Sequence, residues 1–128
     1  MDRAIALHRE VLETTLRYFR PPYGQLALSS VLSARRHGLE TVLWSAWGKE
    51  WSEADPNAVL RRLDRSVYPG AIVLLHDNDV SCPSGTGDRT RRVLPLLAAQ
   101  LRSRGLRAAT LSELLDVPAQ DRRGETAA

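Results

Sequence analysis

The chain has little cysteine, few aromatic residues and no long hydrophobic run. Of its 128 residues, 1 is cysteine, Cys82, and 5% are aromatic. A single thiol cannot form an internal disulfide, so the redox compartment is left open. No stretch approaches the roughly 18 consecutive apolar residues that a membrane-spanning helix needs, which predicts no membrane contact. The first residues also lack the pattern of a signal peptide, so the sequence as written predicts a cytoplasmic protein.

Lysine is scarce as well. Lys49 is the single lysine among 18 basic residues, and the formal net charge is +3. The arginines are scattered over expected helix surfaces and form no continuous block. A nucleic-acid-binding protein would gather such charge on one face and interleave aromatic side chains with it. The sequence therefore predicts no nucleic-acid partner.

Helical and extended patterns alternate along the chain, and a length of 128 residues fits one domain. We expect helices over 1–13, 26–37, 56–67 and 89–104, a short helix capped by Ser112, and strands over 17–20, 41–44, 71–75 and 106–110. Strands joined through helices run parallel, with right-handed crossovers. The sequence therefore predicts an α/β domain over 1–116, followed by a polar tail over 117–128.

Three segments that carry polar or aromatic residues follow expected strands. They are Arg20-Pro21-Pro22-Tyr23-Gly24, the stretch from Trp44 to Trp51, and the pair His76-Asp77. If the strands are parallel, these segments emerge at one carboxyl edge, where α/β proteins build their sites. Closing a barrel takes about eight strands, so four strands indicate an open sheet or a part of a barrel.

The residue types in these segments suit hydrolytic chemistry. His76 ends a run of apolar residues, and histidine is the side chain best suited to proton transfer near neutral pH, although it could also simply bond to a loop. Arg20 could hold a carboxylate through two hydrogen bonds. The backbone N–H of Tyr23 could be aimed at a developing oxyanion, or the Tyr23 ring could instead cap the core.

The second segment holds all three tryptophans, Trp44, Trp47 and Trp51, together with Glu50. Indole rings on an exposed loop pack against sugar rings, but a tryptophan cluster is also common in protein cores. A carboxylate at Glu50 could orient the imidazole of His76 as a general acid requires, or it could be an ordinary solvated side chain.

In this order and spacing, the three segments resemble the last three motifs of the polysaccharide deacetylase family, also called the NodB-homology family or carbohydrate esterase family 4. The resemblance implies that Arg20 positions a catalytic Asp and that the main-chain amide of Tyr23 binds the oxyanion. It also implies that His76 is the general acid and that the carboxylate of Glu50 tunes it. Trp51 would line the groove with its indole, and Leu74 would form a wall of the acetyl pocket. We add Trp47 as a further candidate for contact with substrate.

Two departures from the family pattern matter. Glu50 stands where the family has Asp, and the extra methylene group would shift its contact with His76 and weaken catalysis. The family's Thr-Phe-Asp-Asp and His-x-x-x-His motifs, which give the general base and an Asp-His-His metal triad, are absent. His8, His37 and His76 are not spaced as i,i+4, and we expect none of them to bind metal. A zinc or cobalt type of ion is implied for complete family members, whereas this chain is expected to bind no metal by itself.

The sequence thus predicts a parallel-stranded portion of a distorted (β/α) barrel whose N-terminal strands are missing. The implied reaction is metal-assisted hydrolysis of N-acetyl or O-acetyl groups on a polysaccharide or oligosaccharide, and the isolated chain is expected to be inactive. The alternative is a truncated, inactive relic that still binds carbohydrate. Expected partners are the acetylated glycan and either a missing N-terminal half or a second copy, bound through an exposed sheet edge.

Overall fold

The computed structural model describes residues 1–116 and has the α/β composition that the sequence predicts. The chain divides between Leu43 and Trp44 into two compact units. The predicted polar tail over 117–128 lies outside the described residues. No helix in the described part is both long and apolar enough to cross a bilayer.

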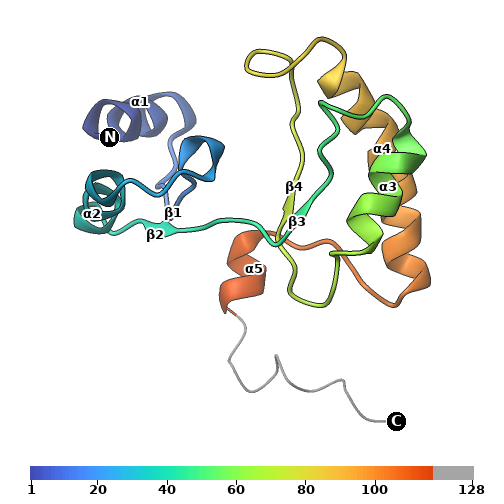
Figure 1. Cartoon of the computed structure of the whole chain (residues 1–128). Helices are drawn as coiled ribbons and strands as arrows, with labels where there is room; N and C mark the ends of the chain where they lie inside the picture. The colour runs from blue at the N-terminus through green and yellow to red at the C-terminus, as the bar shows by residue number, and fades with distance from the viewer. Residues whose placement is uncertain (117–128) are drawn as a thin grey trace. The chain divides into compact units, whose positions relative to one another are not determined.

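The first unit carries a pair of short parallel strands. Its elements, in chain order, are α1 (Asp2–Leu12), β1 (Tyr18–Phe19), the 3₁₀ helix η1 (Pro22–Gly24), α2 (Leu28–Arg36) and β2 (Glu40–Thr41) (Figure 1). Tyr18 lies opposite Glu40 in the register, and the N–H of Val42 extends the pairing by donating to the carbonyl of Phe19 at 2.8 Å. The turn with Arg20 therefore leaves the carboxyl end of β1.

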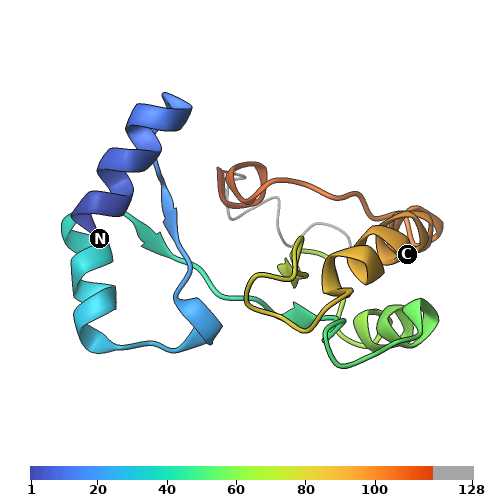
Figure 2. The same cartoon turned by 90° about the horizontal axis from the view of Figure 1, so that it is seen from above.

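The second unit carries the other parallel pair and the larger helices. Its elements are β3 (Ala46–Trp47), α3 (Pro56–Asp64), β4 (Val73–Leu74), α4 (Thr86–Ser103) and α5 (Leu111–Asp116). In both views, α3 and α4 lie side by side (Figures 1 and 2). The register pairs Ala46 with Val73 and Trp47 with Leu74, so the residues that follow both strands lie at one edge.

A hydrophobic core joins these two helices to β3. The buried cluster contains Val59 and Leu63 of α3, Val93 and Leu97 of α4, and Ala46 of β3. These residues lie at the helical spacing that the sequence pattern predicts. Burial of one apolar face from each helix fixes α3 and α4 against the strands that carry the candidate site.

Three expectations about the elements are wrong. Residues 106–110 form no strand. They follow a Schellman turn at the end of α4, in which the Leu106 N–H donates to the Leu101 carbonyl at 2.8 Å. Residues 46 and 47 do form a strand, which falls in the stretch expected to be a loop. The short helix α5 is capped by Thr110 and not by Ser112, since Thr110 and Glu113 exchange the hydrogen bonds of a capping box.

The start of α4 also differs from the expectation. The helix begins at Thr86, three positions before Arg89, and Pro95 lies in its interior. Asp79 accepts hydrogen bonds from the N–H groups of Gly85 and Gly87, at 2.7 and 2.9 Å. The first-turn donors of α4 are thus satisfied from a residue well upstream, which a local capping pattern does not reveal.

Candidate functional site

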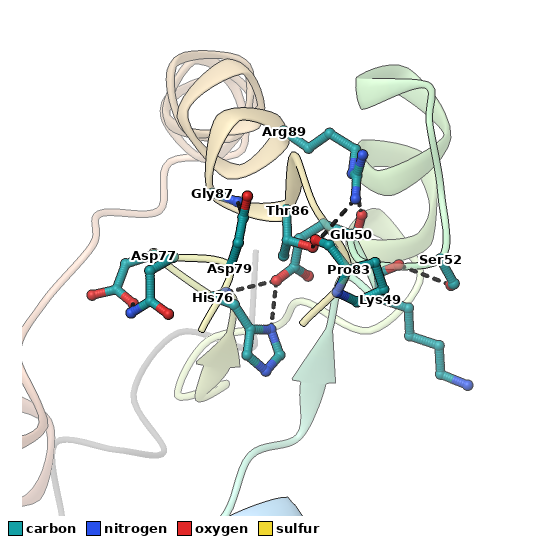
Figure 3. A network of polar contacts seen from close by, with 11 residues as sticks. Lys49, Glu50, Ser52, His76, Asp77, Asp79, Pro83, Thr86, Gly87 and Arg89 are labelled. Atoms are coloured by element: carbon teal, nitrogen blue, oxygen red, sulfur yellow. Dashed lines mark hydrogen bonds and ion pairs between the residues drawn. The ribbon is translucent and has the colours of Figure 1, made fainter. Parts of the chain in front are cut away.

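The carboxyl ends of β3 and β4 bring Glu50 and His76 together. Oε1 of Glu50 lies 2.6 Å from Nδ1 of His76, and the same oxygen accepts the backbone N–H of His76 at 2.6 Å. The Glu50 side chain is fully buried, whereas that of His76 is 31% exposed. Figure 3 shows the carboxylate on one side of the imidazole ring and the second ring nitrogen pointing away from it.

This geometry determines how the ring is used. With the carboxylate ionised, Nδ1 carries a hydrogen and donates it to Glu50. Nε2, on the opposite side of the ring, is the nitrogen that can exchange a proton with a bound molecule. The solvated alternative for Glu50 is therefore wrong, and the longer side chain does reach His76.

Glu50 reaches His76 through space left by a glycine. A Cβ atom added at Gly48 would lie 2.8 Å from Cδ2 of Leu75, 3.0 Å from Cγ1 of Val59 and 3.2 Å from Oε2 of Glu50. Real Cβ atoms show almost no contacts under 3.0 Å, so a side chain at this position would displace its neighbours. Between Gly48 and Glu50, Lys49 adopts a left-handed backbone conformation with φ of 52°. The sharp path of the chain at 48–50 turns the carboxylate inward.

The three tryptophans form a row of mutually tilted rings that ends at the histidine. The ring centroids of Trp44 and Trp47 are 5.7 Å apart, and those of Trp47 and Trp51 are 4.8 Å apart. Trp51 meets the His76 ring edge-on at 5.2 Å. All three indoles are half-buried, and Nζ of Lys49 lies 4.8 Å from the ring centre of Trp47. The row is thus partly packed and partly exposed, and it places one indole beside the imidazole.

The remaining predicted site residues fall in both units. Leu74 is half-buried in β4 directly opposite Trp47, so it belongs with the pair of Glu50 and His76. Arg20 and Tyr23 belong to the first unit. The convergence of all three segments at one site stays a prediction.

Tyr23 has an unusual backbone. Its φ and ψ are 56° and 13°, a left-handed conformation that non-glycine residues rarely adopt, and its side chain is 81% exposed. The ring therefore does not cap the core. Within residues 1–116, the N–H of Tyr23 has no hydrogen-bond acceptor, whereas the next two N–H groups bond back to Pro21 and Pro22. Strain of this kind is often found at functional sites.

The described residues do not fit a bound zinc or cobalt ion. Within 1–116, no group of three or more His, Cys, Asp or Glu side chains is close enough to hold a metal. Nε2 of His8 contacts Oγ1 of Thr14 at 2.9 Å, and Nε2 of His37 contacts Oδ1 of Asp2 at 2.6 Å. A catalytic zinc site needs about three protein ligands that converge on one point.

Comparison with known proteins identifies the family. No family model matches the sequence. A chitooligosaccharide deacetylase of Bradyrhizobium sp. (strain ANU 289) is 32% identical over 104 residues, which cover 77% of this chain and 48% of that protein. A peptidoglycan-N-acetylglucosamine deacetylase of Bacillus cereus is 33% identical over 102 residues, covering 76% of this chain and 44% of that protein. The chain belongs to the polysaccharide deacetylase family. It spans about half the length of these curated relatives.

Solved structures give the fold of this deacetylase-family chain. A carbohydrate esterase family 4 pseudoenzyme from Bacillus anthracis superposes with a TM-score of 0.78 and 25% identity, covering 90% of this chain and 38% of the other. A family 4 carbohydrate esterase from Streptomyces lividans gives a TM-score of 0.72 with 24% identity, covering 87% and 53%. The predicted fold, a portion of the NodB-type α/β architecture, is confirmed.

Sequence reasoning missed two residues that support the site of this deacetylase-family chain. Arg89 donates from Nε to the carbonyl of Glu50 at 2.6 Å. Asp79 accepts the N–H groups of Gly87 and Gly85, which hold the pKa of its carboxyl below the ordinary value of 3.8. The signal in the sequence is the polar stretch 78–88, which holds two glycines and two acidic residues directly before Arg89.

Proposed function

We propose that this chain supplies the proton-donating side of a polysaccharide deacetylase site. His76 is the general acid, Glu50 orients it, and Trp51 and Leu74 line the groove for the sugar and its acetyl group. The observation that carries the proposal lies at the carboxyl end of β4. There the backbone N–H and the ring nitrogen Nδ1 of His76 both contact one buried carboxylate oxygen of Glu50.

The chemistry of amide hydrolysis gives each residue a task. Attack of water on the acetyl carbonyl forms a tetrahedral oxyanion, and the amine leaves only when it receives a proton. Nε2 of His76 donates that proton while Glu50 stabilises the imidazolium through Nδ1. The N–H of Tyr23, which has no acceptor among residues 1–116, suits the oxyanion, because such a donor requires no rearrangement when charge develops. The family resemblance further implies that Arg20, an exposed residue of the first unit, holds a carboxylate.

We propose acetylated amino sugars as the substrate class. The two curated relatives are named for chitooligosaccharides and for N-acetylglucosamine in peptidoglycan. The half-buried indole of Trp51 lies beside His76 and offers an apolar face to a sugar ring. N-acetylglucosamine oligomers are accordingly the probe of choice.

No residue of 1–116 is assigned as the general base or as a group that binds the attacking water. We propose that turnover needs these groups from a further segment, a partner or a second copy. The chain by itself is then expected to release no acetate, with or without added zinc or cobalt.

A second candidate function is carbohydrate binding without hydrolysis. The structural likeness to a family 4 pseudoenzyme favours it, as does the row of tryptophans that ends at His76. In this case the indoles would still hold sugar, while His76 and Glu50 would be remnants of a site.

Two assays on the same protein test both candidates. Glycan binding is followed by tryptophan fluorescence, and acetate release is measured with N-acetylglucosamine oligomers and added zinc or cobalt. Binding that weakens in Trp51→Ala and persists in the surface control Leu94→Ala supports a sugar site. Acetate release abolished by His76→Gln with binding retained supports the acid role and contradicts the expected inactivity, whereas release insensitive to His76→Gln overturns that role.

A further inference from the structure

The first turn of α4 contacts Glu50 and the residues that directly follow His76. Arg89 donates from Nε to the backbone carbonyl of Glu50 at 2.6 Å, across 39 positions of sequence. A Cβ atom added at Gly87 would lie only 2.8 Å from the carbonyl oxygen of Asp77, the residue that follows His76. One helical turn therefore packs against the segment that carries the carboxylate and against the segment that carries the imidazole (Figure 3).

The guanidinium of Arg89 is held on its other side as well. Its Nη2 donates to Oγ1 of Thr86 at 3.2 Å and to the carbonyl of Ser84 at 3.4 Å. Thr86 is fully buried, and its hydroxyl donates to the carbonyl of Pro83 at 2.6 Å. Because the planar guanidinium is anchored at several points, its Nε–H points in a fixed direction.

The turn itself is fixed by Asp79. The carboxylate of Asp79 accepts N–H groups from Gly85 and Gly87, so the start of α4 is tied to the loop that leaves β4. The segment at Glu50, in contrast, follows a residue in a left-handed conformation and lies beyond the short β3. Its backbone carbonyl is placed by the bond from Arg89.

We propose that Arg89 is a positioning residue for the Glu50–His76 pair. It holds the backbone of Glu50 so that the carboxylate meets Nδ1 of His76, while Gly87 allows the strand end with His76 to approach the same turn. The inference rests on the proposed function of His76 as a general acid, but the geometry that it explains is measurable without any substrate.

The test is nitrogen-15 NMR of the His76 imidazole in the full chain. The wild type is expected to show an Nδ1-protonated ring with a slowly exchanging downfield imidazole proton. In Arg89→Ala, that proton is expected to exchange about tenfold faster, the factor that corresponds to loss of one hydrogen bond. Arg89→Lys keeps a donor but not the fork, and it should give an intermediate rate. Arg91→Ala is the control, since Arg91 lies on the same helix, is exposed and pairs with Asp88.

Gly87→Ala is the second variant, and it keeps the proposal testable if Arg89→Ala does not fold. Alanine favours helix over glycine, but its methyl group would lie 2.8 Å from the Asp77 carbonyl oxygen, so a merely structural role for this position predicts altered stability with an unchanged His76 signal. The proposal predicts that the new methyl group displaces the Asp77 backbone and weakens the His76 signal.

The outcomes separate this inference from the proposed function. An unchanged His76 signal in folded Arg89→Lys and Gly87→Ala would overturn the positioning role and leave the acid role standing. A wild-type ring protonated at Nε2 instead of Nδ1 would contradict both. The expected result is faster exchange of the His76 proton in the Arg89 variants and a weaker His76 signal in Gly87→Ala, with Arg91→Ala like the wild type.

Discussion

A single carboxylate oxygen, Oε1 of Glu50, holds His76 at two points, the backbone N–H and the ring nitrogen Nδ1, each at 2.6 Å. The strand end and the ring are thereby fixed by the same atom. The second oxygen, Oε2, is buried without a hydrogen-bond partner in the part of the chain that is described. Both the position and the orientation of the imidazole thus depend on residue 50.

Removal of this carboxylate should lower stability as well as function. Glu50→Ala leaves the backbone N–H of His76 without its partner, and a buried unsatisfied donor costs about 1–3 kcal/mol in the free energy of unfolding. Urea denaturation measures this loss. Glu53→Ala, in the same loop, is the control and should change stability by less than about 0.5 kcal/mol. Equal effects of the two substitutions would contradict the assigned role of Glu50.

Gly48→Ala should destabilise the protein by crowding the site. The new methyl group would meet Leu75 at 2.8 Å and Oε2 of Glu50 at 3.2 Å, and overpacking of this kind costs about 1–3 kcal/mol. Leu75→Val removes the atom that clashes, so the double variant should recover part of the loss. A double-mutant cycle from denaturation curves measures the coupling between the two positions. Strictly additive effects would show that the methyl group meets no resistance from Leu75.

Asp79 should make stability depend on acid pH. Its pKa is held below 3.8 by the N–H groups of Gly87 and then Gly85. A carboxyl whose folded pKa is lowered contributes stability above its unfolded pKa, and this contribution is lost as the pH falls through the folded value. Asp79→Asn should therefore be less stable than the wild type at neutral pH, with the difference shrinking below about pH 4. Thermal unfolding over a pH series measures it.

Ser81→Ala, in the same exposed loop, is the control for this pH series and should show no pH-dependent difference from the wild type. If the gap between wild type and Asp79→Asn stays constant from neutral to strongly acid pH, the carboxylate of Asp79 does not cap α4.

The packing of α3 against α4 gives a core prediction. Leu63 is fully buried in the cluster between these helices, whereas Leu94 is 49% exposed. Leu63→Ala should cost about 2–5 kcal/mol in the free energy of unfolding, since it removes buried surface and leaves a cavity. Leu94→Ala deletes the same atoms from a surface position and should cost much less. Similar losses for both would contradict the described packing of the second unit.

The sequence predicted His76 and its carboxylate because both follow apolar runs in a spacing that resembles family motifs. It also predicted α3, because Asp55 and Pro56 are local start signals, and Asp55 does accept the N–H of Asn57 at 2.9 Å. It did not predict β3, since a strand of only Ala46 and Trp47 leaves no periodic pattern to detect.

The role of Arg89 was beyond sequence reasoning for another reason. Its partner, the carbonyl of Glu50, is a backbone atom 39 positions away, and any residue type offers such a carbonyl. The start of α4 was missed because its capping carboxylate, Asp79, lies eight positions before Gly87. Contacts that depend on backbone atoms and long sequence separations become visible only in the folded chain.

The central claim is that the cluster of Glu50, Trp51 and His76 is the place where an acetylated sugar binds and receives a proton. NMR titration of the full chain with N-acetylglucosamine oligomers tests it most directly. We predict saturable shifts of the His76 imidazole and Trp51 indole signals. The His76 shift is expected to be lost in Trp51→Ala, and both shifts are expected to be kept in Leu94→Ala. Saturating glycan that leaves both signals unmoved, or that shifts only residues far from them in the second unit, would contradict the claim.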